Sequence, residues 1–223
     1  MKKSPSAEPV RIVIVDDHPM VRERLADVIN RESDLRVCGE AEDRAGALEV
    51  VAREKPGLAI VDLTLKRSNG LDLIKDLHVM HPNLLILVLS MQDESLYAER
   101  VVRAGAHGYI TKYEATGKIL DAIRQILSGK MFLSPEVSDD ILSRMLGKSK
   151  AALRSIDVLS DRELQVFELV GQGYGTRQIA EFLGLDGKTV ETYRSRIKEK
   201  LEIKDASELL RRAIAWKHES PEE

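Results

Sequence analysis

Cysteine, aromatic residues and long apolar runs are all scarce in this sequence. Cys38 is the single cysteine, so no disulfide forms within the chain, and five scattered histidines supply no cluster with zinc-site spacing. Aromatic residues make up only 4% of the chain, so aliphatic side chains must fill its core. The longest wholly apolar run is Leu84–Leu89, whereas a membrane-spanning helix needs about 20 apolar residues. Because the first ten residues also lack the apolar core of a signal peptide, we expect a cytoplasmic protein without membrane contacts.

The charge of the chain is nearly balanced, which limits how it can contact nucleic acid. The formal net charge is −3; residues 1–154 are neutral, and residues 155–223 carry all of it. Proteins that coat nucleic acid indiscriminately are strongly basic, so any DNA-binding surface here must be a local patch. The length of 223 residues fits one large or two ordinary domains.

The first half of the chain alternates short apolar runs with segments of helical periodicity. Apolar runs bounded by turn residues are typical of buried parallel strands, and Cys38 is expected to be buried in the second of them. The predicted strands are residues 10–15, 35–41, 58–61, 84–90 and 107–111. Since a helix is predicted after each strand, the fold class is α/β, with a five-stranded doubly wound parallel sheet of the flavodoxin-like type.

Five polar residues follow the predicted strands at their carboxyl ends: Asp16, Asp17, Asp62, Ser90 and Lys112. In a parallel sheet these ends lie on one edge, so the side chains can converge. Three carboxylates would repel one another unless a cation neutralises them, and a hard divalent ion such as Mg²⁺ prefers oxygen ligands. A metal, a lysine and a hydroxyl around one acid suit a phosphoryl group in transfer. The alternative for a single acid after a strand is a cap of the next turn.

Over roughly Val10–Lys130 the sequence resembles the receiver domain of two-component response regulators, because these polar residues match its site in type and order. The resemblance implies that Asp62 is the phospho-acceptor and that Asp17, Asp62 and the backbone carbonyl of Thr64 hold Mg²⁺, with Asp16 acting through water. It also implies that Ser90 and Lys112 bind the phosphoryl oxygens.

Tyr109, three residues before Lys112, matches the aromatic switch position of the receiver family. The resemblance implies that Tyr109 turns inward when the hydroxyl residue engages the phosphate. The alternative is that Tyr109 is a packing residue at a strand end.

The second half of the chain has a wholly helical pattern. A linker comes first, with a short helix opened by Ser134-Pro135 and then a polar segment, residues 147–155, which is expected to be a hinge. Ser160 and Glu163 then form a capping box at the start of the next helix. Two short helices joined through glycine turns lead to a longer helix over about residues 187–202, which is the pattern of a helix-turn-helix. The basic side chains of this last helix form the local patch and are Lys188, Arg194, Arg196, Lys198 and Lys200. The alternative is a solvated helix of mixed charge.

Over about Val158–Trp216 the sequence resembles the LuxR-type helix-turn-helix, on the motifs LSDRE at 159–163 and KTVET at 188–192. Its pairing with a receiver is that of the NarL/FixJ class. The resemblance implies base-reading or groove-facing positions for Glu191, Thr192 and Ser195. It implies phosphate contacts for Lys188, Arg194, Arg196 and Lys198.

The last predicted helix, about residues 205–218, has an apolar stripe formed by Leu209, Leu210, Ala213 and Ile214. In the family this helix helps the DNA-bound dimer to form. The alternative is that the stripe closes the core of a four-helix domain.

These observations predict a transcription regulator with a receiver domain at 10–130, a linker at 131–157 and a DNA-binding domain at 158–218. A sensor histidine kinase is expected to phosphorylate Asp62 with Mg²⁺, after which a homodimer binds double-stranded DNA. One alternative is a DNA-binding protein regulated independently of phosphate. Another is an aspartyl-phosphate phosphatase, although Thr64 stands where such enzymes often have their general acid.

Overall fold

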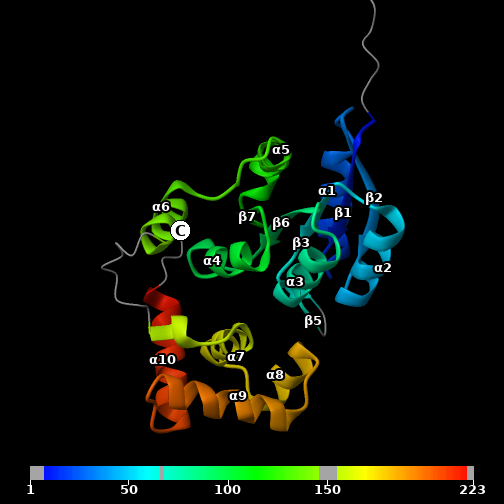
Figure 1. The fold of residues 1–223 in the computed structure, drawn as a ribbon. Coiled ribbons are helices and arrows are strands. Elements are labelled where there is room, and N and C mark those ends of the chain that lie inside the picture. Colours follow the sequence, from blue (N-terminus) through cyan, green and yellow to red (C-terminus); the bar gives the residue numbers. More distant parts are fainter. Residues whose placement is uncertain (1–7, 66–67, 146–154, 220–223) are drawn as a thin grey trace, which may run out of the picture. The chain divides into compact units, whose positions relative to one another are not determined.

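The computed structural model describes residues 8–65, 68–145 and 155–219 (Figure 1). The chain divides into two compact units, Met1–Ile141 and Leu142–Glu223, called here the α/β unit and the helical unit. Residues 147–154 of the predicted hinge lie outside the described residues. Within the described ranges, no helix combines the length and apolarity that crossing a membrane requires.

The α/β unit is built on a five-stranded sheet. Its strands lie in the order β2-β1-β3-β6-β7, and every neighbouring pair is parallel. This order is that of a doubly wound, flavodoxin-like sheet, which confirms the predicted fold class. The strands are β1 (Val10–Val15), β2 (Leu35–Ala41), β3 (Leu58–Val61), β6 (Leu85–Ser90) and β7 (Gly108–Thr111).

Helices cover both faces of this sheet (Figure 1). Alternate strand residues point to opposite faces, and Ile12, Ile60 and Ile110 therefore pack with two helices in one aliphatic core. The helices of that face are α1 (Pro19–Ile29) and α5 (Ala115–Leu127), and those of the other face are α2 (Arg44–Glu54), α3 (Gly70–Met80) and α4 (Glu94–Ala104). Cys38 is only half-buried, contrary to expectation, because it lies in edge strand β2.

A small hairpin separates β3 from α3. Its strands β4 (Thr64–Leu65) and β5 (Ser68–Asn69) pair antiparallel. Asn69 then caps α3, because its side chain accepts a hydrogen bond from the backbone of Leu71 at 2.8 Å. The Gly70 backbone N–H donates to the Leu63 carbonyl at 3.0 Å, so the chain returns after the hairpin to the residue that precedes β4.

Replacing Gly70 by alanine is expected to destabilise the α/β unit strongly. A Cβ atom at Gly70 would lie 2.1 Å from the Asp62 carbonyl oxygen and 2.6 Å from the Leu63 Cα, and backbone atoms cannot move aside cheaply. We expect a loss of about 3 kcal/mol, the upper end of typical overpacking costs, in chemical unfolding followed by circular dichroism. Gly117→Ala is the matched control, since nothing lies within 4 Å of its Cβ position, and it should be neutral or stabilising. Equal stabilities of the two variants would contradict the close approach at Gly70.

In residues 155–219, the helical unit contains four helices after the short turn η1 (Ser155–Val158). They are α7 (Asp161–Gly171), α8 (Thr176–Leu183), α9 (Gly187–Lys200) and α10 (Ala206–Glu219), and α6 (Pro135–Met145) precedes them at the boundary of the two units. The predicted capping box is present, with Ser160 and Glu163 each bonded to the other's backbone N–H. Phe167, Ile179 and Val190 are fully buried and join α7, α8 and α9 in one core.

Candidate functional site

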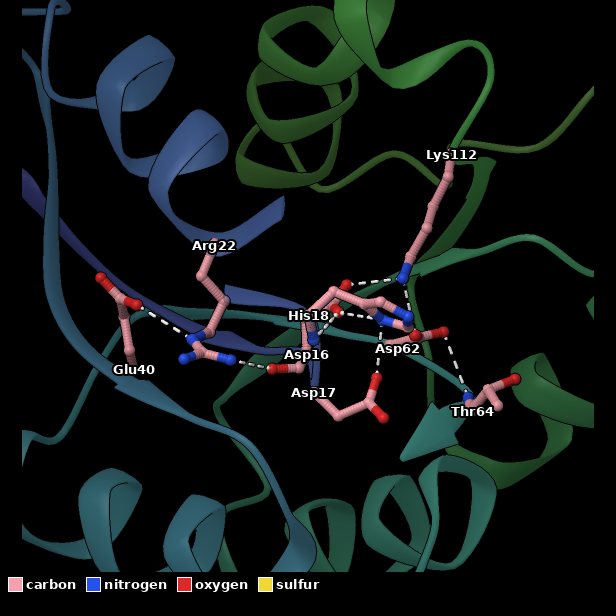
Figure 2. A network of polar contacts seen from close by, with 8 residues as sticks. All are labelled: Asp16, Asp17, His18, Arg22, Glu40, Asp62, Thr64 and Lys112. Atoms are coloured by element: carbon pink, nitrogen blue, oxygen red, sulfur yellow. Dashed lines mark hydrogen bonds and ion pairs between the residues drawn. The ribbon is translucent and has the colours of Figure 1, made fainter. Parts of the chain in front are cut away.

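Two nearly fully buried carboxylates lie at the carboxyl edge of the sheet. Asp16 follows β1 and Asp62 follows β3, with 1% and 2% of their surface exposed. Backbone hydrogen bonds continue the strand pairing up to both acids, because Asp62 N donates to the Val15 carbonyl at 2.8 Å and Asp16 N to the Ala41 carbonyl at 3.1 Å. The sheet itself therefore brings the two acids together (Figure 2).

Lys112 joins these two acids from the end of β7. Its Nζ atom lies 2.7 Å from Oδ2 of Asp62 and 2.7 Å from Oδ2 of Asp16. The Lys112 backbone N–H donates to the Ser90 carbonyl at 2.8 Å, which fixes the start of the loop that carries the lysine. Figure 2 shows the side chain reaching down from this loop to the acids. One ammonium group thus bridges two buried carboxylates.

Burial and the lysine act on Asp62 in opposite directions. Burial raises the pKa of the Asp62 carboxyl, and the Lys112 ammonium offsets this only in part. The pKa of Asp62 is therefore raised from 3.8 to about 6. For Lys112, burial lowers the pKa, but the carboxylates of Asp62 and Asp16 outweigh it and leave the pKa raised. Near neutral pH the site therefore holds an ionised acid and a charged lysine.

This raised pKa predicts a pH-dependent stability of the α/β unit in the presence of a metal chelator. Because the folded protein holds the Asp62 proton up to a higher pH than the unfolded chain does, the free energy of unfolding falls as the pH rises. From about pH 4 to about pH 7 the contribution of Asp62 falls by about 3 kcal/mol. The measurement is urea unfolding followed by circular dichroism for the wild type and Asp62→Asn. Parallel pH profiles of the two proteins would refute this prediction.

The carboxylates also form a potential cation site. Asp16, Asp17, Asp62 and His18 each offer a ligand atom, and these atoms all lie within 4.8 Å of one another. Three carboxylates against one lysine leave negative charge uncompensated, and clustered oxygen ligands are what Mg²⁺ prefers. The donor set therefore fits a hard divalent cation such as Mg²⁺.

His18 and Arg22 are members of this site that sequence reasoning missed. The His18 ring contacts Asp17 at 2.7 Å and Asp16 at 3.2 Å. Arg22, on the first turns of α1, donates to the backbone carbonyl of Asp16 and also pairs with Glu40 (Figure 2). The only sign of their role in the sequence is that both residues follow the acid pair closely. Helical periodicity does not show which side chains of a helix point toward the site.

The remaining predicted residues of the α/β unit lie beside this cluster. The Thr64 backbone N–H donates to Asp62 Oδ1 at 3.1 Å. Ser90 is fully buried at the end of β6, and its hydroxyl accepts from the backbone N–H of Gln92 at 3.2 Å. Tyr109 is 1% exposed and donates its hydroxyl hydrogen to the Gln92 carbonyl at 2.9 Å. Gln92 thus links the predicted phosphate-binding serine to the predicted switch tyrosine.

In the helical unit, α9 presents most of the predicted DNA-contacting side chains to solvent. Its buried face is formed by Val190 and Ile197. The predicted residues with exposed side chains are Lys188, Glu191, Thr192, Ser195 and Arg196, and those with half-buried side chains are Arg194 and Lys198.

The structure reduces the basic patch that the sequence predicts on α9. Lys200 lies 2.7 Å from the buried carboxylate of Glu163, so its charge is paired within the domain. Arg194 donates to the Thr176 hydroxyl at 2.9 Å. The predicted patch therefore overestimates the positive charge available to phosphates, because periodicity does not show which charges pair within the domain.

Two of the four predicted dimerisation residues are core residues. Leu209 and Ala213 are fully buried, because α10 packs against α7, so they cannot form a dimer surface on the folded unit. Leu210 and Ile214 are 39% and 38% exposed, respectively. The predicted stripe therefore splits into a buried row and an exposed row.

Comparison with known families agrees with the fold. Residues 12–124 match the response regulator receiver domain, and residues 157–213 match the bacterial regulatory proteins of the luxR family. The chain therefore belongs to the two-component response regulators of the NarL/FixJ class, which are phosphorylation-controlled, DNA-binding transcription regulators. This membership sets the phosphatase alternative aside.

Relatives match most or part of this chain. The oxygen regulatory protein NreC of Staphylococcus carnosus is 31% identical over 213 residues, which cover 93% of this chain and 98% of NreC. The structure of a LuxR-family response regulator from Aurantimonas sp. SI85-9A1 is 31% identical and has a TM-score of 0.57, covering 62% of this chain and 99% of its own. A structure of two RcsB dimers bound to two parallel DNAs is 26% identical, with a TM-score of 0.55, and covers 92% of this chain and 97% of its own.

Proposed function

We propose that Asp62 is the phospho-acceptor and takes its phosphoryl group from a phosphohistidine of a sensor histidine kinase. The observation that carries this proposal is the bridge from Lys112 to Asp16 and Asp62, beside the further carboxylate of Asp17 (Figure 2). An Asp62 carboxylate oxygen attacks phosphorus, the bond from phosphorus to the histidine nitrogen breaks, and an acyl phosphate forms. Lys112 moves its contact from the carboxylate to a phosphoryl oxygen and stabilises the added charge.

The Mg²⁺ expected at this site would be held by Asp17, Asp62 and the Thr64 carbonyl, with Asp16 acting through water. When bound, the ion supplies positive charge that offsets the charge of the phosphoryl oxygens. Arg22 and His18 orient the acid pair, because they contact the Asp16 carbonyl and the Asp17 carboxylate. The chain thus provides a fixed acid pair against which the metal and Asp62 are aligned.

Phosphorylation reaches the surface of the α/β unit through Ser90, Gln92 and Tyr109 in this proposal. A Ser90 hydroxyl that turns to a phosphoryl oxygen leaves the Gln92 N–H, and Gln92 also accepts the Tyr109 hydroxyl bond. The Tyr109 side chain is already buried in this structure. In this proposal phosphorylation therefore changes its hydrogen bonding and does not move it from solvent into the core.

The output of this switch is a homodimer on double-stranded DNA. We propose that Glu191, Thr192 and Ser195 face the bases of the major groove, and that Lys188, Arg196 and Lys198 meet phosphates, with a lesser contribution from Arg194. Leu210 and Ile214 are exposed large apolar residues of α10, and in this proposal they contact the second copy in the dimer. The RcsB dimers on DNA support this assembly by similarity. The proposed domain limits stay at 10–130 and 158–218, with 131–157 as the linker.

One comparison tests phosphate control directly. The full chain is studied with and without beryllofluoride and Mg²⁺, and its mass is measured by sedimentation and its DNA affinity by titration. We expect the phosphoryl mimic to shift the chain from monomer to dimer and to raise its DNA affinity by about tenfold, which corresponds to a coupling free energy of about 1.4 kcal/mol. An equal dimer population in both conditions would instead favour regulation independent of phosphate.

A further inference from the structure

We propose that Thr176 is a positioning residue that holds Glu191 for the readout of a base amino group in the DNA major groove. This inference rests on the proposed function of α9 and adds a residue outside that helix. The observation behind it is a chain of hydrogen bonds that runs from Glu191 through the Thr176 hydroxyl to Arg194.

The direction of these hydrogen bonds is set by chemistry. A threonine hydroxyl has one hydrogen to donate and lone pairs to accept, whereas a carboxylate only accepts and a guanidinium only donates. The Thr176 hydroxyl therefore donates to Oε1 of Glu191 and accepts from Nη1 of Arg194, at 2.9 Å from Arg194. Its full donor capacity is used, and the glutamate is joined to a positive charge through one intervening group.

Thr176 lies between two helix starts that are each closed by a hydrogen bond. Thr176 is the first residue of α8, just after Gly175, whose backbone N–H donates to the Gln178 side chain at 3.0 Å. α9 begins with a second fixed cap, because Asp186 accepts from Thr189 N at 2.9 Å. The two helices pack together (Figure 1), so the hydroxyl is presented to Glu191 from a separate, anchored element.

This arrangement gives Glu191 a defined role at the groove. Its side chain is exposed, and Thr176 engages Oε1. In this proposal Oε2 accepts a hydrogen bond from DNA. In the major groove, the donors that a carboxylate can reach are the amino groups of cytosine N4 and adenine N6. Arg194, linked through the hydroxyl, offsets the repulsion between this carboxylate and the phosphates. Prior ordering of the side chain reduces the entropy lost on binding.

The test measures base preference with the full chain bound to beryllofluoride and Mg²⁺. Its DNA site is selected from randomised duplexes, and affinities are then measured for each base at every selected position. We compare the wild type with Thr176→Val, which keeps the shape without the hydroxyl, Thr176→Ser, which keeps the hydroxyl, and Glu191→Ala. Circular dichroism and thermal unfolding establish that each variant is folded.

We expect the wild type to discriminate by about 5- to 100-fold at one base pair that carries cytosine or adenine opposite Glu191. Glu191→Ala should abolish this preference, Thr176→Val should reduce it at least about threefold at the same position only, and Thr176→Ser should retain it. The salt dependence of binding should not change in Thr176→Val, since no phosphate contact is lost.

Two results would overturn the proposal. Undiminished discrimination by Thr176→Val, alongside its loss in Glu191→Ala, would show that Glu191 needs no positioning by Thr176. An equal loss of affinity for all sequences in Thr176→Val would reduce Thr176 to a structural residue. If Glu191→Ala and Lys188→Ala both left the DNA affinity and the base preference unchanged, the proposed function of α9 itself would be contradicted.

Discussion

Asp62→Asn should abolish phosphorylation of the chain and, with it, phosphate-dependent DNA binding. An amide nitrogen is not a nucleophile toward phosphorus at neutral pH, and the amide also lacks the charge that pairs with Lys112 at 2.7 Å. We expect label from acetyl phosphate to fall at least about 100-fold, equivalent to about 2.7 kcal/mol or more in activation free energy. The rise in DNA affinity after treatment with this phosphodonor should disappear as well.

Asp121→Asn is the matched control for this experiment. Asp121 is an exposed carboxylate on α5, outside the acidic cluster, so this variant should be labelled like the wild type. Because Asp62→Asn removes a carboxylate whose pKa burial raises to about 6, the variant should stay folded at neutral pH. Stoichiometric, base-labile labelling of Asp62→Asn would contradict the assignment of the acceptor.

The second large effect is expected from two basic residues of α9. Lys188→Ala with Arg196→Ala removes two exposed charges at the proposed DNA surface without opening the core of the helical unit. If each contacts one phosphate, the slope of log affinity against log salt should become less steep by about 2, because each contact releases about 0.9 counterion. We expect DNA affinity to fall about 10- to 100-fold at moderate salt, almost equally for all DNA sequences.

Lys204→Ala provides the charge-matched control for this double variant. Lys204 is also exposed but lies beyond the end of α9, so its loss should change the salt slope little. Fluorescence titrations at several salt concentrations measure both quantities. A salt slope that is the same in the double variant and in Lys204→Ala would exclude Lys188 and Arg196 as phosphate contacts.

Much of the fold could be predicted from the sequence because local patterns carry it. The runs Ile12–Val15 and Leu58–Val61 are apolar and buried on both faces, which is typical of parallel strands covered by helices on both sides. The capping box of Ser160 and Glu163 marks the start of α7 with residues that are adjacent in the chain. The convergence of Asp16 and Asp62 also followed, since the ends of parallel strands must share an edge.

By itself, then, the sequence determined the two-part architecture, the acids at the sheet edge and the helix with basic residues. Only the tertiary structure decided which groups pair. It joins Lys112 to Asp62 across 50 positions of the chain, pairs the exposed Lys200 with the buried carboxylate of Glu163, and buries Leu209. The physical reason is that periodicity defines the face on which a residue lies. The partner on that face depends on how distant elements pack, and this packing is also what brings Thr176 to Glu191.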